Sequence, residues 1–211
     1  MAARSPPAAK PKAEDIPTDF LVVGLGNPGG DFERSRHNSG ADTVALLARR
    51  HGASLKADRR ARALAGALTV AGQRLALAFP QTYYNDSGIA VLTLAKRHDL
   101  LDTPDRIVIV HDELDLPVGR LKVKVGGGLA GNKGLQSIKS HLHTDAFVRV
   151  RIGVGKPPGR LEGADHVLRR PGKTERAELN VTIEEAADAV EMIVTEGPEA
   201  AMTNFNQRDD S

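Results

Sequence analysis

The segment Phe20-Leu-Val-Val-Gly-Leu-Gly-Asn-Pro-Gly-Gly30 decides the fold. Its first four residues are apolar, as in a short buried strand, and the glycines that follow mark a tight turn where that strand ends. Residues 24–29 also match G-x-G-x-x-G, the pattern of dinucleotide-binding α/β proteins. However, Pro28 lacks a backbone N–H that a phosphate cradle would use, and residues 30–40 lack the apolar spacing of a helix. The motif is therefore weak evidence for a nucleotide site.

Further short apolar runs alternate with helical patterns along the chain. Strands are predicted at residues 74–79, 106–110 and 149–154, with two further candidates at 64–70 and 121–125. Helical spacing of apolar residues is found at residues 41–50, 87–96, 135–141 and 174–196. This alternation predicts a layered α/β domain with a mixed sheet. Because 211 residues with 40% hydrophobic content suffice for one core, we expect a single catalytic domain, residues 18–211.

Composition narrows the class of protein. The absence of cysteine excludes disulfides and thiolate metal sites, and it fits a cytoplasmic location. The chain has no apolar run close to the ~20 residues that a membrane helix needs. Residues 1–17 contain several prolines and alanines but no apolar signal-peptide core, so we expect a disordered N-terminal arm there.

Charge is distributed unevenly although the net charge is only +2. Residues 120–173 hold twelve Lys and Arg against three Asp and Glu, whereas residues 174–211 hold two against ten. Glycine clusters in the basic segment would bring backbone N–H groups near an anion. This pattern predicts a polyanion-binding face beside an acidic helix, and the alternative is two ordinary solvated surfaces. With two tyrosines and no tryptophan, nucleic acid would be recognised through phosphates and shape.

Polar side chains follow three of the predicted strands. Asn27 and His37 come after residues 20–23, Asn85 comes after residues 74–79, and Asp112 comes after residues 106–110. Ligands of open α/β sheets lie beyond the carboxyl ends of the strands, so we expect these side chains to converge. A histidine oriented by an aspartate can take a proton from water, and asparagines can bind a carbonyl or its oxyanion. Since cysteine and G-x-S-x-G are absent, water is the expected nucleophile.

Each of these residues also has an ordinary structural interpretation. His37 can be a loop histidine, Asp112 part of a cap or a surface ion pair, and Asn27 a turn-forming residue. Asn85 can belong to the N-cap of the next helix. A metal site within residues 111–115 is disfavoured, because neighbouring strand residues alternate faces and a second histidine with suitable spacing is missing. We therefore do not predict a metal site.

A second glycine-rich segment, residues 126–134, precedes the helix predicted at residues 135–141. Glycines before a helix N-terminus favour an anion, and Lys133 adds a positive charge, although the spacing is not that of a Walker loop. The alternative is a flexible surface loop or lid. Two nearby predicted strands each carry two basic residues at alternate positions, so the two residues of each strand face one side of the sheet. These residues form a candidate phosphate clamp: Lys122, Lys124, Arg149 and Arg151.

Four segments, taken in order, resemble the bacterial-type peptidyl-tRNA hydrolases over roughly residues 19–206: VVGLGNPGGDFERSRHNSG, PQTYYNDSG, HDELDLPVGRLKVKVGGGLAGNKGLQSIKSHL and RVRIGVGKPPG. The resemblance implies a single α/β domain with a twisted mixed β-sheet sandwiched between helices. It also implies hydrolysis of the ester between a peptide and the 3′ ribose of tRNA, which recycles tRNA from aborted translation. The family needs neither metal nor cofactor. We expect tRNA as the partner, no membrane attachment, and a monomer.

The resemblance assigns roles residue by residue. His37 matches the catalytic base, and Asp112 matches the aspartate that orients it. The implied substrate-binding residues are Asn27, Phe32, Tyr84, Asn85, Asn132 and Lys133. The implied contacts to tRNA phosphate are Lys122, Lys124 and Arg151.

Some positions depart from the family pattern. Residues 130–134 usually read G-G-H-N-G, so Asn132 replaces a histidine and Lys133 replaces a substrate-contacting asparagine. A lysine donates hydrogen bonds but cannot accept them. Where the family usually has an aromatic residue followed by methionine, this chain has Tyr83-Tyr84, and Phe32 replaces a tyrosine. An alternative function is therefore a catalytically weak RNA-binding relative of the same fold, although retention of the base and its aspartate favours an active hydrolase.

Overall fold

The computed structural model describes residues 17–157, 159 and 162–207. Residues 1–16 of the predicted N-terminal arm lie outside the described residues. The strands are β1 (Phe20–Gly24), β2 (Lys56–Asp58), β3 (Ala63–Val70), β4 (Gln73–Pro80), β5 (Ile107–Glu113), β6 (Leu121–Val125) and β7 (Val148–Gly153). The helices are α1 (Ser39–Arg50), α2 (Ser87–Arg97), α3 (Lys133–Leu142), α4 (Gly163–Leu168), α5 (Lys173–Glu196) and α6 (Pro198–Asn206), with short 3₁₀ turns η2 (Arg36–Asn38), η3 (Tyr84–Asp86) and η4 (Pro104–Arg106).

The strands form one seven-stranded sheet in the order β2-β3-β4-β1-β5-β7-β6. Strand β1 is parallel to β4 and β5, and β5 is parallel to β7, whereas β3 and β6 are antiparallel to their neighbours. The predicted mixed sheet is therefore confirmed. Since β1, β4 and β5 are parallel, their carboxyl ends lie at one edge of the sheet, where the polar residues of the sequence were expected to meet.

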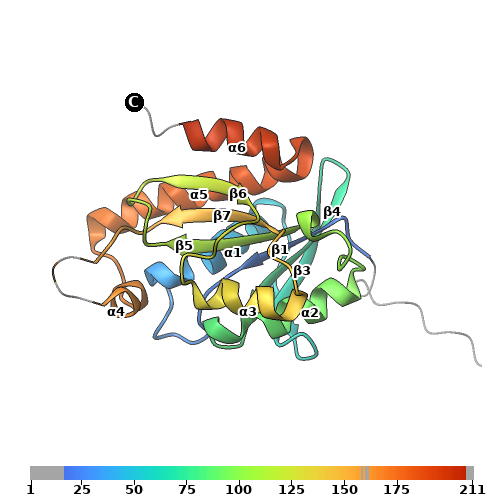
Figure 1. Cartoon of the computed structure of the whole chain (residues 1–211), viewed down its shortest axis with the longest axis horizontal. Helices are drawn as coiled ribbons and strands as arrows, with labels where there is room; N and C mark the ends of the chain where they lie inside the picture. The colour runs from blue at the N-terminus through green and yellow to red at the C-terminus, as the bar shows by residue number, and fades with distance from the viewer. Residues whose placement is uncertain (1–16, 158, 160–161, 208–211) are drawn as a thin grey trace, which may run out of the picture.

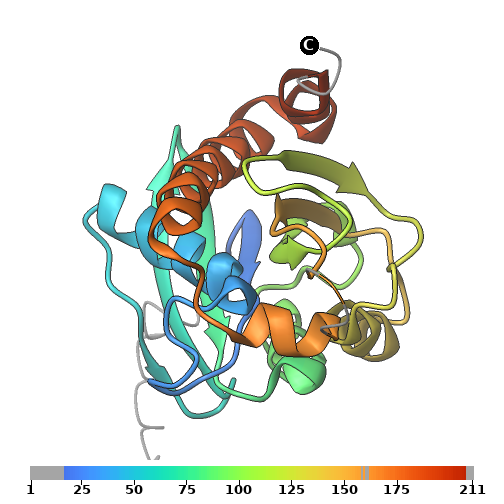
Figure 2. The same cartoon turned by 90° about the vertical axis from the view of Figure 1, so that its left-hand side faces the viewer.

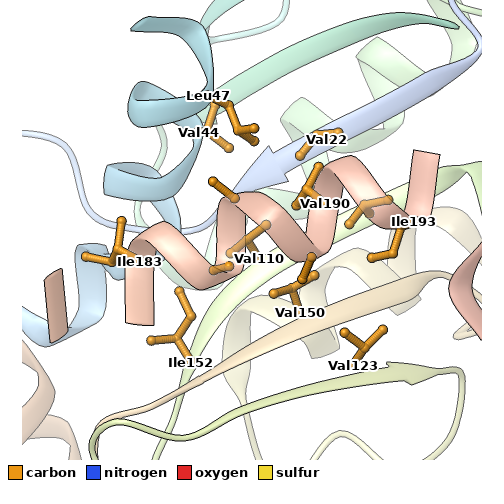
Figure 3. Packing of buried hydrophobic residues seen from close by; sticks show 14 of the residues in the cluster. Val22, Val44, Leu47, Val110, Val123, Val150, Ile152, Ile183, Val190 and Ile193 are labelled. Carbon is orange, nitrogen blue, oxygen red and sulfur yellow. The ribbon is translucent and has the colours of Figure 1, made fainter. Parts of the chain in front are cut away.

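Helices cover both faces of the sheet (Figures 1 and 2). Helices α1, α5 and α6 pack on one face, and α2 and α3 pack on the other. In Figure 3, Ile183, Val190 and Ile193 of α5 lie over Val110 of β5 and Val150 of β7. Because both faces are covered, β5 is buried at every position, which explains its unbroken apolar run.

The strands and helices predicted from the sequence are confirmed, with shifts at their ends. Strand β5 continues to Glu113, so residues 111–113 extend the strand and do not follow it. Helix α6 was not predicted because only two of its side chains, Ala201 and Phe205, are buried. Asn206 at its end donates to the Val123 carbonyl (2.9 Å) and accepts from the Val123 N–H (2.8 Å). This carboxamide thereby pairs backbone groups of the edge strand β6 that would otherwise be open.

Close backbone packing sets the position of α1. A Cβ atom at Gly24 would lie 2.1 Å from the Gly40 carbonyl oxygen, and one at Gly40 would lie 2.2 Å from the Val110 carbonyl oxygen. The Ala41 N–H also donates to the Leu25 carbonyl (3.1 Å). The first turn of α1 is therefore pressed against β1 and β5. This contact fixes the preceding turn, η2, at the carboxyl edge of the sheet.

Candidate active site

His37 and Asp112 form a hydrogen-bonded pair at this edge. His37 is the middle residue of η2, and its Nδ1 lies 2.9 Å from both carboxylate oxygens of Asp112 on β5. The Asp112 side chain is 4% exposed and that of His37 is 15% exposed. The opposite ring nitrogen, Nε2, has no hydrogen-bond partner in the described part of the chain. The pair thus has the geometry of a histidine base oriented by a carboxylate.

The pair lines a cavity of ≈ 550 Å³. Its walls come from the turn after β1, from η2 and η3, from the end of β5, and from the start of α3. All eight residues predicted for catalysis or substrate binding line this cavity: Asn27, Phe32, His37, Tyr84, Asn85, Asp112, Asn132 and Lys133. One further wall is α4, including Val167 and Leu168, which was not predicted. Helix α4 has six residues, which are too few to show a helical period in the sequence.

Asn27 is held by a neighbour that sequence reasoning did not single out. The Asn38 carboxamide accepts from the Asn27 N–H (2.8 Å) and donates to the Asn27 carbonyl (2.9 Å). The Asn27 Oδ1 atom accepts from the Tyr84 N–H (2.9 Å), while its Nδ2 has no partner among the described residues. A Cβ atom at Gly26 would lie 2.8 Å from the Asn38 Oδ1. Because Gly26 has no side chain, Asn38 can bind the backbone of Asn27. The side-chain NH₂ group of Asn27 therefore remains available in the cavity.

Tyr84 contacts both members of the pair. Its ring stacks on His37 with ring centroids 3.6 Å apart, and its hydroxyl donates to the Asp112 Oδ1 (3.1 Å). Burial, followed by the charge of Asp112, raises the pKa of this hydroxyl well above its ordinary value. Burial tends to raise the pKa of Asp112, but His37, His111 and the Tyr84 hydroxyl together outweigh burial, so the net pKa is lowered. The site therefore contains a neutral phenol and an ionised carboxylate at neutral pH.

His111 supports the strand beneath the pair. It is fully buried, and its Nδ1 donates to the carbonyl oxygen of Asp112 (2.7 Å). Burial lowers its pKa, so the ring is neutral at neutral pH. Its Nε2 is buried and has no partner among the described residues. The histidine of His111-Asp112-Glu113 thus supports the backbone and does not line the cavity.

The basic residues of β6 and β7 lie beside the cavity, not in it. In the sheet register, Lys122 is opposite Arg151 and Lys124 is opposite Arg149, as expected from their alternation. Lys124 is exposed, and Arg151 donates through Nε (3.1 Å) and Nη2 (3.0 Å) to Glu113 Oε2. This places three of the four candidates on one surface next to the site.

Arg149 is the exception. It is only 2% exposed, and its guanidinium donates to the carbonyl oxygens of Gly126, Gly127 and Gly128. The prediction that Arg149 belongs to the phosphate clamp is therefore wrong, because its N–H donors bind backbone carbonyl groups of the glycine segment. Alternation along the strand correctly predicted the face of the sheet on which Arg149 lies, but it did not predict that the side chain is buried.

Two features are absent from the described residues. None of the helices there has both the length and the apolar character needed to cross a membrane. That part of the chain also contains no group of three or more His, Cys, Asp or Glu side chains arranged to hold a metal ion.

Comparison with known proteins gives consistent similarities. The family model for peptidyl-tRNA hydrolase matches residues 21–211. The chain is 47% identical to the peptidyl-tRNA hydrolase of Cutibacterium acnes, over 89% of the chain and 98% of the relative. It is 46% identical to that of Mycobacterium tuberculosis, over 89% and 97%. The crystal structure of peptidyl-tRNA hydrolase from Acinetobacter baumannii superimposes with a TM-score of 0.83 at 34% identity, covering 93% of this chain and 97% of that one.

Proposed function

The chain belongs to the peptidyl-tRNA hydrolase family, whose members hydrolyse the ester between peptide and tRNA, and we propose that His37 is the base that activates water for this reaction. The observation that carries the proposal is the His37–Asp112 pair at the wall of the cavity. Asp112 holds the Nδ1 proton, so Nε2 is the basic nitrogen and is the one without a protein partner among the described residues.

The reaction follows from this arrangement. A water molecule bound at His37 Nε2 transfers a proton to that nitrogen as its oxygen attacks the ester carbonyl. The amides of Asn27 and Asn85 line the cavity and donate to the carbonyl oxygen as it becomes an oxyanion. The tetrahedral intermediate then collapses, the C–O bond to the ribose breaks, and the 3′ oxygen takes the proton back from His37. The products are the free peptide and tRNA.

The basic surface beside the cavity suits the tRNA part of the substrate. We assign Lys122, Lys124 and Arg151 to its phosphates, because they share one face of β6 and β7 beside the cavity. A cytoplasmic, monomeric enzyme without metal or cofactor completes the proposal. The alternative, a weakly active RNA-binding relative, is not favoured by any of the observations.

Release of an N-acetylated amino acid from acylated tRNA tests the base. We expect turnover by the wild-type chain and a loss of about 10²–10⁴-fold in kcat/KM for His37→Ala, because the base is removed while the cavity remains. The wild-type kcat/KM should fall at acid pH, because a base must be unprotonated to accept a proton from water. A flat profile, or a fully active His37→Ala, would contradict the role. Unblocked aminoacyl-tRNA is the control substrate.

A second assay tests the phosphate contacts. Lys124→Ala should raise KM for full-length acylated tRNA about 3- to 10-fold and leave a short aminoacyl-nucleotide unaffected, because only the longer substrate reaches the basic surface. The effect on tRNA should shrink as the salt concentration rises. Equal losses on both substrates would contradict the assignment.

A further inference from the structure

Tyr84 is fixed in the site on several sides. Its side chain is 5% exposed and stacks on His37 at an interplanar angle of 18°. Gly134, in the first turn of α3, allows this position, since a Cβ atom there would lie 2.5 Å from Cε1 of the tyrosine ring. The Tyr84 backbone N–H is bound by Asn27. The hydroxyl of Tyr84 is thereby held in one place, between α3 and β5.

Hydrogen bonds link this hydroxyl to the N-terminus of α3. Asn132 is the N-cap residue of α3, and its Oδ1 accepts from the Leu135 N–H (3.0 Å). A backbone N–H can only donate, so the other end of the carboxamide is Nδ2, which donates to the Tyr84 hydroxyl oxygen (3.0 Å). Both polar groups of Asn132 are thus used within the protein.

The direction of the remaining bonds follows from these donors. The oxygen of Tyr84 accepts from Asn132, so its single proton points to the Asp112 Oδ1 (3.1 Å), which as a carboxylate can only accept. Asp112 in turn accepts from Nδ1 of His37. The bonds from the start of α3 therefore run from Asn132 through Tyr84 to Asp112, and His37 donates to the same carboxylate from the other side. Because Nδ1 of His37 carries the donated proton, Nε2 is the unprotonated nitrogen of the neutral ring.

The pKa directions of the groups around Asp112 are consistent with these hydrogen-bond directions. Besides His37, the carboxylate of Asp112 is influenced by His111 on its own strand and by Tyr84 from η3. Glu113 and the N-terminal residue of α3, Lys133, also line the cavity. Because the pKa of Tyr84 is raised and that of Asp112 is lowered, the phenol remains the donor and the carboxylate the acceptor.

We propose that Tyr84 is a positioning residue for the His37–Asp112 pair, and that Asn132 orients its hydroxyl from the N-terminus of α3. This inference rests on the proposed role of His37 as the base. The hydroxyl fixes one carboxylate oxygen, and it also stabilises the negative charge that Asp112 presents to the imidazole. Asn132 then acts on the reaction through Tyr84, without needing to contact the substrate.

Tyr84→Phe tests the proposal, since it keeps the stacked ring and removes only the hydroxyl. Without this donor, Asp112 attracts the proton on His37 more strongly, so the acid limb of kcat/KM should move to higher pH by about half a unit. The plateau at high pH should fall about 3- to 10-fold, because the carboxylate is held less well. A role in packing alone would not move the pH midpoint.

The matched control is the only other tyrosine of the chain. Tyr83→Phe removes the same group from a side chain that is 66% exposed, and it should leave the pH midpoint in place. Asn132→Ser provides the second test, because serine also caps a helix but is too short to reach Tyr84. It should move the midpoint in the same direction as Tyr84→Phe, by a smaller amount. Thermal melting of each variant establishes that it is folded.

The outcomes separate the two proposals. A wild-type chain without turnover, or a His37→Ala variant with full turnover, would overturn the role of His37 itself. A pH-dependent wild type with an unchanged midpoint in Tyr84→Phe would overturn the positioning role and leave the base in place. A midpoint that moves equally in Tyr83→Phe would also overturn it, because the effect would not depend on the bond to Asp112.

Discussion

The two glycine-rich segments of the chain, residues 24–29 and 126–134, contain glycines for two different physical reasons. In the first segment, Gly24 and Gly26 lie where no side chain fits, because Cβ atoms there would lie 2.1 and 2.8 Å from atoms of α1 and η2. In the second, Gly131 is surrounded by open space but has φ +74°. Gly24 and Gly26 are therefore needed for packing, as is Gly134 beside Tyr84, whereas Gly29 and Gly131 are needed for backbone conformation.

The two segments also differ in how far their backbone N–H groups are used within the protein. In the first segment, the Leu25 N–H donates to Val110 and the Asn27 N–H donates to Asn38, so these donors are used internally. In the second, the N–H groups of residues 127–131 have no hydrogen-bond partner in the part of the chain that the structure describes. A match to G-x-G-x-x-G is thus no evidence for a phosphate site until the partners of its N–H groups are known.

The largest effect should come from adding a methyl group at the packed contact. Gly40→Ala would place its Cβ 2.2 Å from the Val110 carbonyl oxygen, so α1 must move away from the sheet. We expect a loss of more than about 3 kcal/mol in the free energy of unfolding, measured with denaturant. Gly30→Ala, where a Cβ would meet no atom within 4 Å, is the matched control and should be close to neutral. Wild-type stability of Gly40→Ala would contradict the packing argument.

This contrast also marks how far the sequence could predict the molecule. Apolar periodicity predicted the strands and the long α5, and the rule for carboxyl strand ends predicted that Asn27, His37 and Asp112 would converge. These predictions depend on local patterns. The role of Asn38 and the burial of Arg149 depend on which backbone atoms come close in three dimensions, and local periodicity does not contain that information.

The roles within the site show the same limit. The resemblance placed Tyr84 and Asn132 at the cavity wall, where the structure has them. Their bond to each other joins residues 48 positions apart and depends on the cap of α3 and on the space at Gly134. Spacing along the chain cannot predict such a bond, because it arises only when two helical turns meet at the edge of the sheet.

The second largest effect should come from releasing the second segment from its support. Arg149→Met keeps the length of the side chain but removes the donors to three carbonyl groups. We expect a loss of about 1–3 kcal/mol, together with faster amide hydrogen exchange across residues 126–131. Arg149→Lys should recover part of the loss, since one donor remains. Arg59→Met, at an exposed position, is the control, and an equal loss there would show that the effect is not specific to the glycine segment.

A smaller effect is expected from a methyl group on the second segment itself. Gly131→Ala meets no atom within 4 Å but must keep a positive φ, so we expect a loss of about 1–2 kcal/mol without displacement of the fold. Gly128→Ala lies in equally open space and has no positive φ, and it should be close to neutral. The two variants separate the cost of conformation from the cost of contact. Equal stabilities would show that the backbone of this segment adapts freely.

The smallest effect should be a gain in the free energy of unfolding, whereas the other changes cause a loss. Ala130 has φ +48°, a conformation that costs an alanine about 1–2 kcal/mol more than a glycine. Ala130→Gly removes this strain but adds freedom to the unfolded chain, so we expect a net gain of about 0.5 kcal/mol. Ala177→Gly in the exposed face of α5 should instead cost about 1 kcal/mol, as glycine does within helices. Because Ala130 lies two residues before the Asn132 cap, a gain in stability that leaves the pH midpoint of kcat/KM in place would show that the strain is separable from the positioning of Tyr84.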